Sequence, residues 1–270
     1  MIFSRLLLGC AMLAASPVLG HEFWIDPQKY QVETGAPLVA DLRNGQNFEG
    51  ITLAWFDNRF TRFDMAQGDA VQPVEGRIGD TPALNTLAPG DGLLVILHET
   101  TPSSLTYKVW DKFLAFAKHK DFTKAAADHA AAGWPQEGFQ ESYTRHAKSL
   151  IAVGTGSGAD RAYGMATEFV ALTNPYEPGF DNQMRVRVQY NNAPRTDAQI
   201  EVFERAPDGT VNITLTRTDL AGEASIPVLP GHHYLFDAVV LRASPQAGTS
   251  EQAPVWETLW AALTFAVPGG

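Results

Sequence analysis

The chain has 270 residues, of which 45% are hydrophobic and 19% charged, and its formal net charge is -10. This length and composition are those of a globular protein with one large domain or two modest ones. The excess of acidic residues argues against a nucleic-acid partner, because a negatively charged surface does not bind a phosphate backbone.

The first twenty residues have the pattern of a secretory signal peptide. Arg5 gives a short positive start, residues 6–15 form an apolar run, and Ser16-Pro17 breaks this run before the modest side chains of residues 18–20. Roughly ten apolar residues are too few for a bilayer, which needs about twenty. We therefore expect cleavage after residue 20, a mature chain that begins at His21, a periplasmic location and no direct membrane insertion.

The single cysteine, Cys10, lies inside this leader, so the mature chain has no thiol and no disulfide. The fold then depends on its core rather than on covalent links. A lipidation motif around Cys10 is the alternative interpretation, but the apolar run continues well past that residue.

Residues 21–105 predict an N-terminal β-sandwich. Short β-prone runs are separated by turns rich in Gly, Asn, Asp and Pro, and strands at this spacing are typical of sandwiches. The runs lie at 52–55, 60–65 and 93–98, and the turns at 44–45, 67–69 and 88–92.

Residues 106–160 predict a helical insert and a linker. Residues 107–119 carry aromatic and apolar side chains at helical spacing, and residues 122–132 are rich in alanine and stop before a glycine. Residues 140–153 are a third helix candidate. The glycine-rich run 154–158 is typical of a loop or flexible linker.

Residues 161–270 predict a second, C-terminal sandwich. Residues 184–188 alternate cleanly between apolar side chains and arginines. Seven β-prone runs lie at 165–172, 183–190, 199–204, 211–217, 223–228, 233–242 and 259–267. The expected fold class is therefore mainly β, with two immunoglobulin-like or transthyretin-like sandwich lobes and a short helical insert between them.

His21 is the sharpest candidate for chemistry. After cleavage it would carry a free α-amino group beside its imidazole, and both can be neutral nitrogen donors near neutral pH. Together they can chelate one metal ion, and a second histidine would complete a three-nitrogen site. Such a ligand set favours copper, with nickel or zinc as alternatives. The competing interpretation is that a signal peptide ends before a histidine by chance.

Three histidines of the predicted insert, His119, His129 and His146, are candidates for the second imidazole. Tyr143 and Arg145 would contact the metal ligands, without binding the metal themselves, and so orient them. None of the spacings is that of a zinc finger or a His-Glu-x-x-His motif, so hydrogen-bonded structural histidines remain the alternative. Arg145 could equally pair with acidic residues between the lobes.

The sequence favours a protein that is not an enzyme. The run 154–158 contains glycines and a serine but no helix-forming apolar stretch after them, unlike a nucleophile elbow. The sequence has neither a P-loop nor a dinucleotide-binding fingerprint.

Five segments together resemble a known periplasmic family. They are residues 21–27, 141–148, 174–176, 218–222 and 256–265. In order and spacing they are similar to the domain-of-unknown-function 4198 family, formerly labelled NikM-like nickel-transport proteins. The resemblance implies a secreted, two-lobed β protein with a histidine at its mature start. It also implies a link to metal uptake, with an outer- or inner-membrane transporter as partner.

The resemblance implies two further histidines that this chain does not have. One would follow the glycine of the first-lobe turn, where this chain has Gly45 and then residues 46–48. The other would lie in the strand before the C-terminal tryptophan segment, where this chain has residues 238–241. Neither stretch contains a histidine. A metal site built from those positions and His21 would be incomplete here, so either the histidines of the insert replace them or metal binding has been lost.

Three functions therefore remain open. The first is a periplasmic metal-binding or metal-uptake accessory protein for copper or nickel that uses His21. The second is a non-catalytic binding module for a protein or glycan partner, and the third is a copper oxidase or oxygenase with an open metal position. The second would need several of the following aromatic residues on one exposed face: Trp24, Trp55, Phe56, Trp110, Trp134, Trp256 and Trp260.

Overall fold

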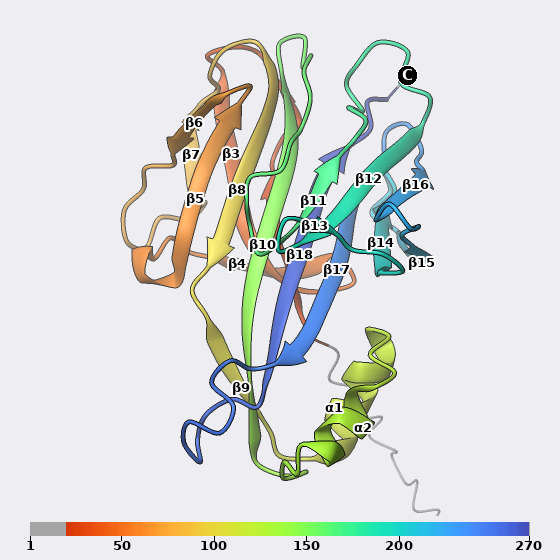
Figure 1. Ribbon diagram of the computed structural model, residues 1–270. Helices are drawn as coiled ribbons and strands as arrows, with labels where there is room; N and C mark the ends of the chain where they lie inside the picture. The colour runs from red at the N-terminus through yellow and green to blue at the C-terminus, as the bar shows by residue number, and fades with distance from the viewer. Residues whose placement is uncertain (1–19, 270) are drawn as a thin grey trace, which may run out of the picture.

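The computed structural model describes residues 20–269 and is built mainly of strands (Figure 1). The mainly β fold class predicted from the sequence is confirmed. Residues 1–19 of the expected signal peptide lie outside the described part of the chain. In the described part, no helix has both the length and the apolar character needed to cross a membrane.

A ten-stranded sheet forms the centre of the molecule. Its strands, in order across the sheet, are β15 (Val211–Arg217), β14 (Gln199–Arg205), β17 (His233–Ala243), β18 (Trp256–Ala266), β10 (Phe139–Val153), β8 (Gly92–Thr100), β5 (Phe60–Gln67) and β6 (Ala70–Pro73). Beside this path, β2 (Gln31–Val32) and β9 (Ser103–Tyr107) also pair with β10. Strands from both expected lobes thus share one sheet, joined where β10 and β18 run parallel.

Two smaller sheets cover opposite faces of the central one. The first contains β1 (Glu22–Pro27), β3 (Pro37–Gln46), β4 (Glu49–Leu53) and β7 (Leu84–Leu87), and the second contains β11 (Thr167–Ala171), β12 (Gln183–Tyr190), β13 (Ala193–Pro194) and β16 (Glu223–Pro227). Strand β8 shows the layering, because Leu94 and Ile96 pack with the first sheet while Leu93, Val95 and Leu97 pack with the second. A strand buried on both faces has an unbroken apolar sequence.

Two α-helices, α1 (Trp110–His119) and α2 (Ala125–Ala131), lie together at one end of the molecule (Figure 1). Both were predicted at nearly these bounds. With the adjoining parts of β9, β10, β17 and β18 they form an aromatic core around Phe113, which is fully buried. A single-turn 3-10 helix, η1 (Asp57–Arg59), precedes β5.

The predicted helix at 140–153 is wrong, because these residues form most of β10. Leu150 and Ala152 face one core of the sandwich, while Ile151 and Val153 face the other. The strand is enclosed on both faces, so its sequence lacks the polar–apolar alternation that would have revealed it. Pairing with four neighbouring strands, β18, β2, β8 and β9, outweighs the local helical pattern.

The predicted turn at 44–45 is also wrong. These residues continue β3, and the hairpin to β4 turns at Asn47 and Phe48, with φ angles of 54° and 60°. Two successive left-handed residues are the geometry of a tight hairpin turn that follows the twist of its strands. Phe48 tolerates this conformation because its ring is fully buried against Trp24.

Candidate functional site

Two neighbouring cavities lie where β1 begins. The first, about 400 Å³, is lined by His21, Glu141 and Trp260 among others, and we call it the His21 cavity. The second, about 410 Å³, is lined by Phe23, Phe56, Phe60 and His98 among others, and we call it the phenylalanine cavity. Asn44, Tyr143 and Arg145 line both of them. These shared side chains therefore form the boundary between the cavities.

Arg145 is the central side chain of this boundary. Tyr143 and Arg145 are two residues apart on β10, so they lie on the same face of the strand. The Arg145 guanidinium lies 4.6 Å from the centre of the Trp260 ring and 5.1 Å from that of Tyr143, and it donates a hydrogen bond to the carbonyl oxygen of His21. Burial lowers the pKa of Arg145 from its ordinary value.

Glu141 is a buried acid in the wall of the His21 cavity. The Tyr107 hydroxyl donates a hydrogen bond to Oε2 over 3.0 Å, and the Thr258 hydroxyl donates one to Oε1 over 2.5 Å. Burial raises the pKa of Glu141 to about 7, although these hydrogen bonds and the charge of Arg145 act to lower it. The site thus contains a carboxyl group that changes charge near neutral pH.

We expect Glu141 to make the protein less stable as the pH rises. Its pKa is higher in the folded state than in the unfolded chain, so the folded state holds the extra proton between these values. Stability is then greatest at low pH and is lost as pH rises through the folded pKa, by about 2 to 3 kcal/mol between about pH 5 and pH 8. Glu141→Gln should flatten this part of the pH profile in urea denaturation. An unchanged profile would contradict the assignment.

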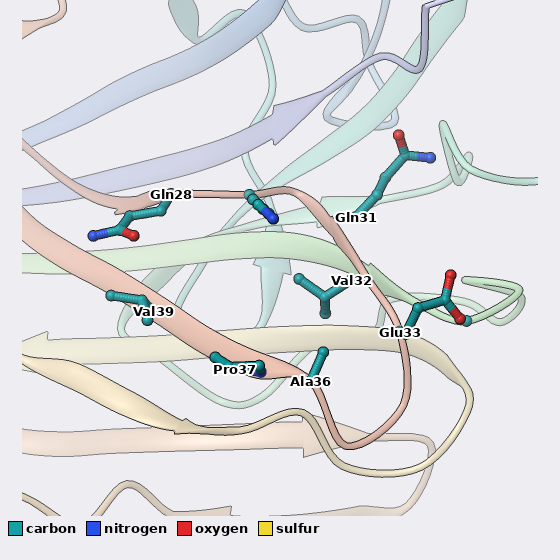
Figure 2. A pocket seen from close by; sticks show the side chains of 9 residues that line it. Gln28, Gln31, Val32, Glu33, Ala36, Pro37 and Val39 are labelled. Atoms are coloured by element: carbon teal, nitrogen blue, oxygen red, sulfur yellow. The ribbon is translucent and has the colours of Figure 1, made fainter.

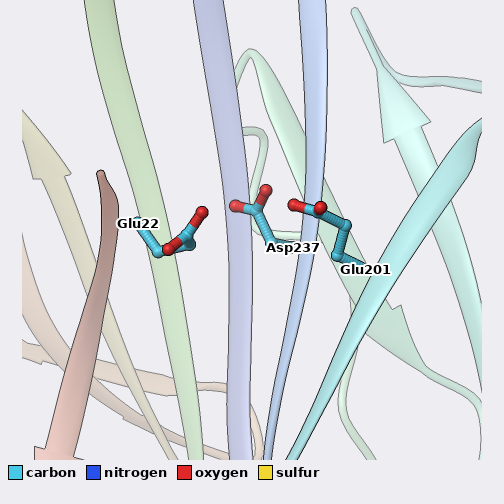
Figure 3. A group of neighbouring side chains, drawn as sticks. All are labelled: Glu22, Glu201 and Asp237. Carbon is cyan, nitrogen blue, oxygen red and sulfur yellow. The ribbon is translucent and has the colours of Figure 1, made fainter. Parts of the chain in front are cut away.

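A buried ionic cluster lies next to this region. The carboxylates of Glu22, Glu201 and Asp237 come from β1, β14 and β17 and point toward one another, with oxygens within 4.8 Å (Figure 3). The spacing alone would suit a metal ion. However, the Lys120 ammonium lies among them, 3.4 Å from Glu22 Oε1 and 2.9 Å from Asp237 Oδ2, and also donates to Glu201. The lysine therefore supplies the cation of this cluster.

The pKa shifts in the cluster show how the charges are shared. Burial and the neighbouring acids raise the pKa of Glu22 to about 7 against the lowering effect of Lys120, and burial likewise raises the pKa of Asp237. Burial would also raise the pKa of Glu201, but the hydrogen bond from His119 and the Lys120 charge outweigh it and lower this pKa. The pKa of Lys120 rises despite burial, because all three acids favour its charge.

The structure does not bring the predicted histidine ligands together. His21 is exposed and lines its cavity, whereas His119 Nε2 lies 2.7 Å from Glu201 Oε1. His146 is buried, with Nδ1 3.1 Å from the carbonyl oxygen of Trp260. Tyr143 and Arg145, the predicted supporting residues, do lie beside His21.

His129 has to be removed from the predicted ligand set. It is buried in the aromatic core, where Nδ1 accepts a hydrogen bond from Trp256 Nε1 and Nε2 lies 3.0 Å from the carbonyl oxygen of Pro135. Both ring nitrogens are thus occupied within the core, and this histidine is structural.

Sequence reasoning missed the acidic cluster and its lysine. Glu201 and Asp237 are single acids inside otherwise apolar strand segments, IEVF and LFDAVV. An isolated acid in a strand that is buried on both faces requires a cationic partner, so this pattern could have indicated the cluster. The identity of the partner, Lys120 at the end of α1, carries no such signal.

A larger cavity, about 550 Å³, surrounds β2 and the start of β3 (Figure 2). Gln28, Val32, Pro37 and Val39 are among its lining residues, and the lining contains no aromatic ring. Its lining residues come from β2, the start of β3 and the turns around them, and all of them are exposed or half-buried. We therefore place the candidate site at the two cavities around Arg145.

The architecture and the paired cavities define a layered, mainly β protein with a candidate site beside the start of β1. The chain belongs to the DUF4198 family, a domain of unknown function, whose model matches residues 18–242. The matched range includes His21, Lys120 and Arg145 and ends before β18.

Two of the solved structures to which this chain is similar have low identity. The D0-D1 domain of intimin has 12% identity and a TM-score of 0.22, over 90% of this chain and 97% of that one. A tetra-tandem repeat from the extending region of a large adhesion protein has 12% identity and a TM-score of 0.19, over 90% of this chain and 49% of the other. Comparison with curated proteins gives no match.

Proposed function

We propose that this protein is a periplasmic metal-binding or metal-uptake accessory protein for copper or nickel, with His21 as the point of attachment. The supporting observation is that His21 is the one exposed histidine among the described residues. Of the other six imidazoles, four have polar contacts: His119 with Glu201, His232 with Glu204, and His129 and His146 with main-chain carbonyls. His98 and His233 are at least half-buried against aromatic rings.

The main chain around His21 is held in place. Its carbonyl oxygen accepts the Arg145 hydrogen bond, and the next residue, Glu22, pairs with Gly45 at the start of β1. After cleavage before His21, the α-amino group and the imidazole would form a two-nitrogen chelate on a fixed backbone. Such a fixed chelate loses little freedom when it binds a metal ion.

The surroundings of His21 favour loose rather than permanent binding. Lys108 and Lys112 are exposed, and together with Arg145 they line the same cavity, so their positive charge opposes a divalent cation. A chelate of two nitrogens also leaves other coordination positions open to a further ligand. We therefore treat the metal as cargo that passes to a membrane transporter, rather than as a resident cofactor.

Calorimetric titration of the mature protein with Cu(II), Ni(II) and Zn(II) tests this function. The protein is expressed with its own leader, so that His21 is the true N-terminus. We expect binding of one ion per chain, and an added N-terminal alanine or His21→Ala should weaken it by about tenfold or more. His232→Ala is the matched control and should leave it unchanged. A metal affinity that is unchanged by the added alanine would exclude a chelate at the N-terminus.

The cavities favour a second candidate, a non-catalytic binding module. Trp24, Trp55, Trp256 and Trp260 are core residues, so they do not form the exposed aromatic face that a flat protein or glycan site would use. Phe56 is exposed at 43% and borders the phenylalanine cavity. A binding function at this end would therefore use the enclosed cavities, and it would persist in the variant with the added alanine.

A further inference from the structure

We propose that the cavities around Arg145 bind a small organic carboxylate with an aromatic or branched apolar body. The carboxylate would pair with the Arg145 guanidinium, and the apolar body would fill the phenylalanine cavity. This site is separate in its chemistry from metal binding at His21 and needs neither a metal ion nor a free N-terminus.

The first argument is the electrostatic position of Arg145. The residue is only 8% exposed, and in the described chain no carboxylate oxygen lies within 4.0 Å of its guanidinium. Within residues 20–269, its one side-chain hydrogen bond goes to the carbonyl oxygen of His21. Asp237, Glu22 and Glu141 act on its charge without contacting it. A buried charge with no carboxylate in direct contact is costly, and aromatic rings offset only part of that cost.

The nearest acids are already engaged. Lys120 holds Glu22 and Asp237, and the hydroxyls of Tyr107 and Thr258 hold Glu141. Each of these acids thus has a hydrogen-bonding partner on at least one oxygen, and none of them contacts the Arg145 guanidinium. A carboxylate that enters from the cavity can accept two parallel hydrogen bonds from the guanidinium, and such a charge-assisted pair is about twice as strong as neutral hydrogen bonds.

The second argument is that the phenylalanine cavity has both polar and apolar side chains in its lining. Its polar side chains, apart from His98, are Asn44, Arg59, Thr100, Ser103, Tyr143 and Arg145, so a second positive charge also lines the cavity. Phe23, Leu42, Leu53, Phe56 and Phe60 supply the apolar ones. A volume of about 410 Å³ is typical of sites for small molecules. The lining therefore matches an amphiphilic ligand rather than an inorganic anion.

The third argument is His98, which also lines this cavity. Its ring lies 5.0 Å from Phe23 and 4.9 Å from Phe63, and it is 2% exposed. Neither ring nitrogen has a hydrogen-bond partner among the described residues. Burial lowers the pKa of His98 to about 3, so the ring is neutral and adds no charge to the apolar part. A polar atom on the ligand body would give it a partner.

The test uses 3-phenylpropionate as the probe, followed by calorimetry or ligand-detected NMR on the mature protein without added metal. We expect saturable binding. The matched amide, 3-phenylpropanamide, should bind about tenfold or more weakly, because it loses the charge-assisted pair. Acetate should also bind more weakly, because it lacks the apolar body. The proposal would be overturned if phenylpropionate and its amide bound equally well, or if acetate bound as tightly as phenylpropionate.

Two variants locate the site. Arg145→Gln should reduce phenylpropionate binding to the level of the amide, with Arg185→Gln on the exposed face of β12 as the matched control. Ala54→Trp should block the phenylalanine cavity and leave Arg145 in place, so it decides the question if the Arg145 variant does not fold. Binding that survives Ala54→Trp, or no saturation up to about 10 mM probe, would overturn the proposal.

Discussion

Lys120→Met is expected to lower the free energy of unfolding by about 3 to 5 kcal/mol, because it leaves buried carboxylates without their cation. Methionine nearly matches the length of lysine, so the loss would come from charge rather than from a cavity. The remaining partners are too few: His119 bonds only Glu201, and Asp237 Oδ1 has no partner among the described residues even with Lys120 in place. Urea denaturation of both proteins at neutral pH measures the difference.

Two further variants separate charge from packing at Lys120. Lys118→Met, an exposed position in the last turn of α1, should change stability by less than about 0.5 kcal/mol. Adding Asp237→Asn to Lys120→Met removes one of the unpaired charges and should recover part of the loss. A Lys120→Met protein as stable as the original would show that the acids are protonated and that the lysine does not stabilise them.

The strands and helices that could be predicted are those with a clear period. Residues 184–188 alternate and form part of β12, and the apolar spacing within residues 107–119 led to α1. Strand β10 could not be found in this way, because both of its faces are buried and alternation disappears. Strands β1 and β3 were also missed, although Glu22–Pro27 is almost entirely buried.

The site was less predictable than the fold, because it depends on contacts between distant residues. Lys120 bonds to acids that are 98, 81 and 117 positions away in the chain. No local pattern encodes such pairing. Sequence reasoning placed Tyr143 and Arg145 near His21 only through the supposed metal site, whereas the structure places them there as the boundary between two cavities.

Lys148→Met is expected to destabilise the protein by about 3 to 4 kcal/mol, less than the Lys120 substitution. Lys148 is fully buried in β10, and its ammonium donates to Asp160 Oδ2 over 2.9 Å and to the carbonyl oxygen of Phe169 over 2.8 Å. Unlike the acids around Lys120, those around Lys148 keep main-chain donors, since Asp160 accepts from Ala171 N and Glu168 from Gly164 N. The difference in partners, not in burial, sets the order of the two effects.

The position of Lys148 also predicts where the structure would loosen. The lysine ties β10 in the central sheet to the segment 160–169 that leads into β11 of a covering sheet. Hydrogen exchange of the Lys148→Met protein should therefore accelerate in residues 160–169 before the rest of the chain. Lys29→Met, at an exposed position, should change neither exchange nor stability. Uniform acceleration across both cores would instead mean that Lys148 stabilises the molecule as a whole and does not serve as a local attachment between the two sheets.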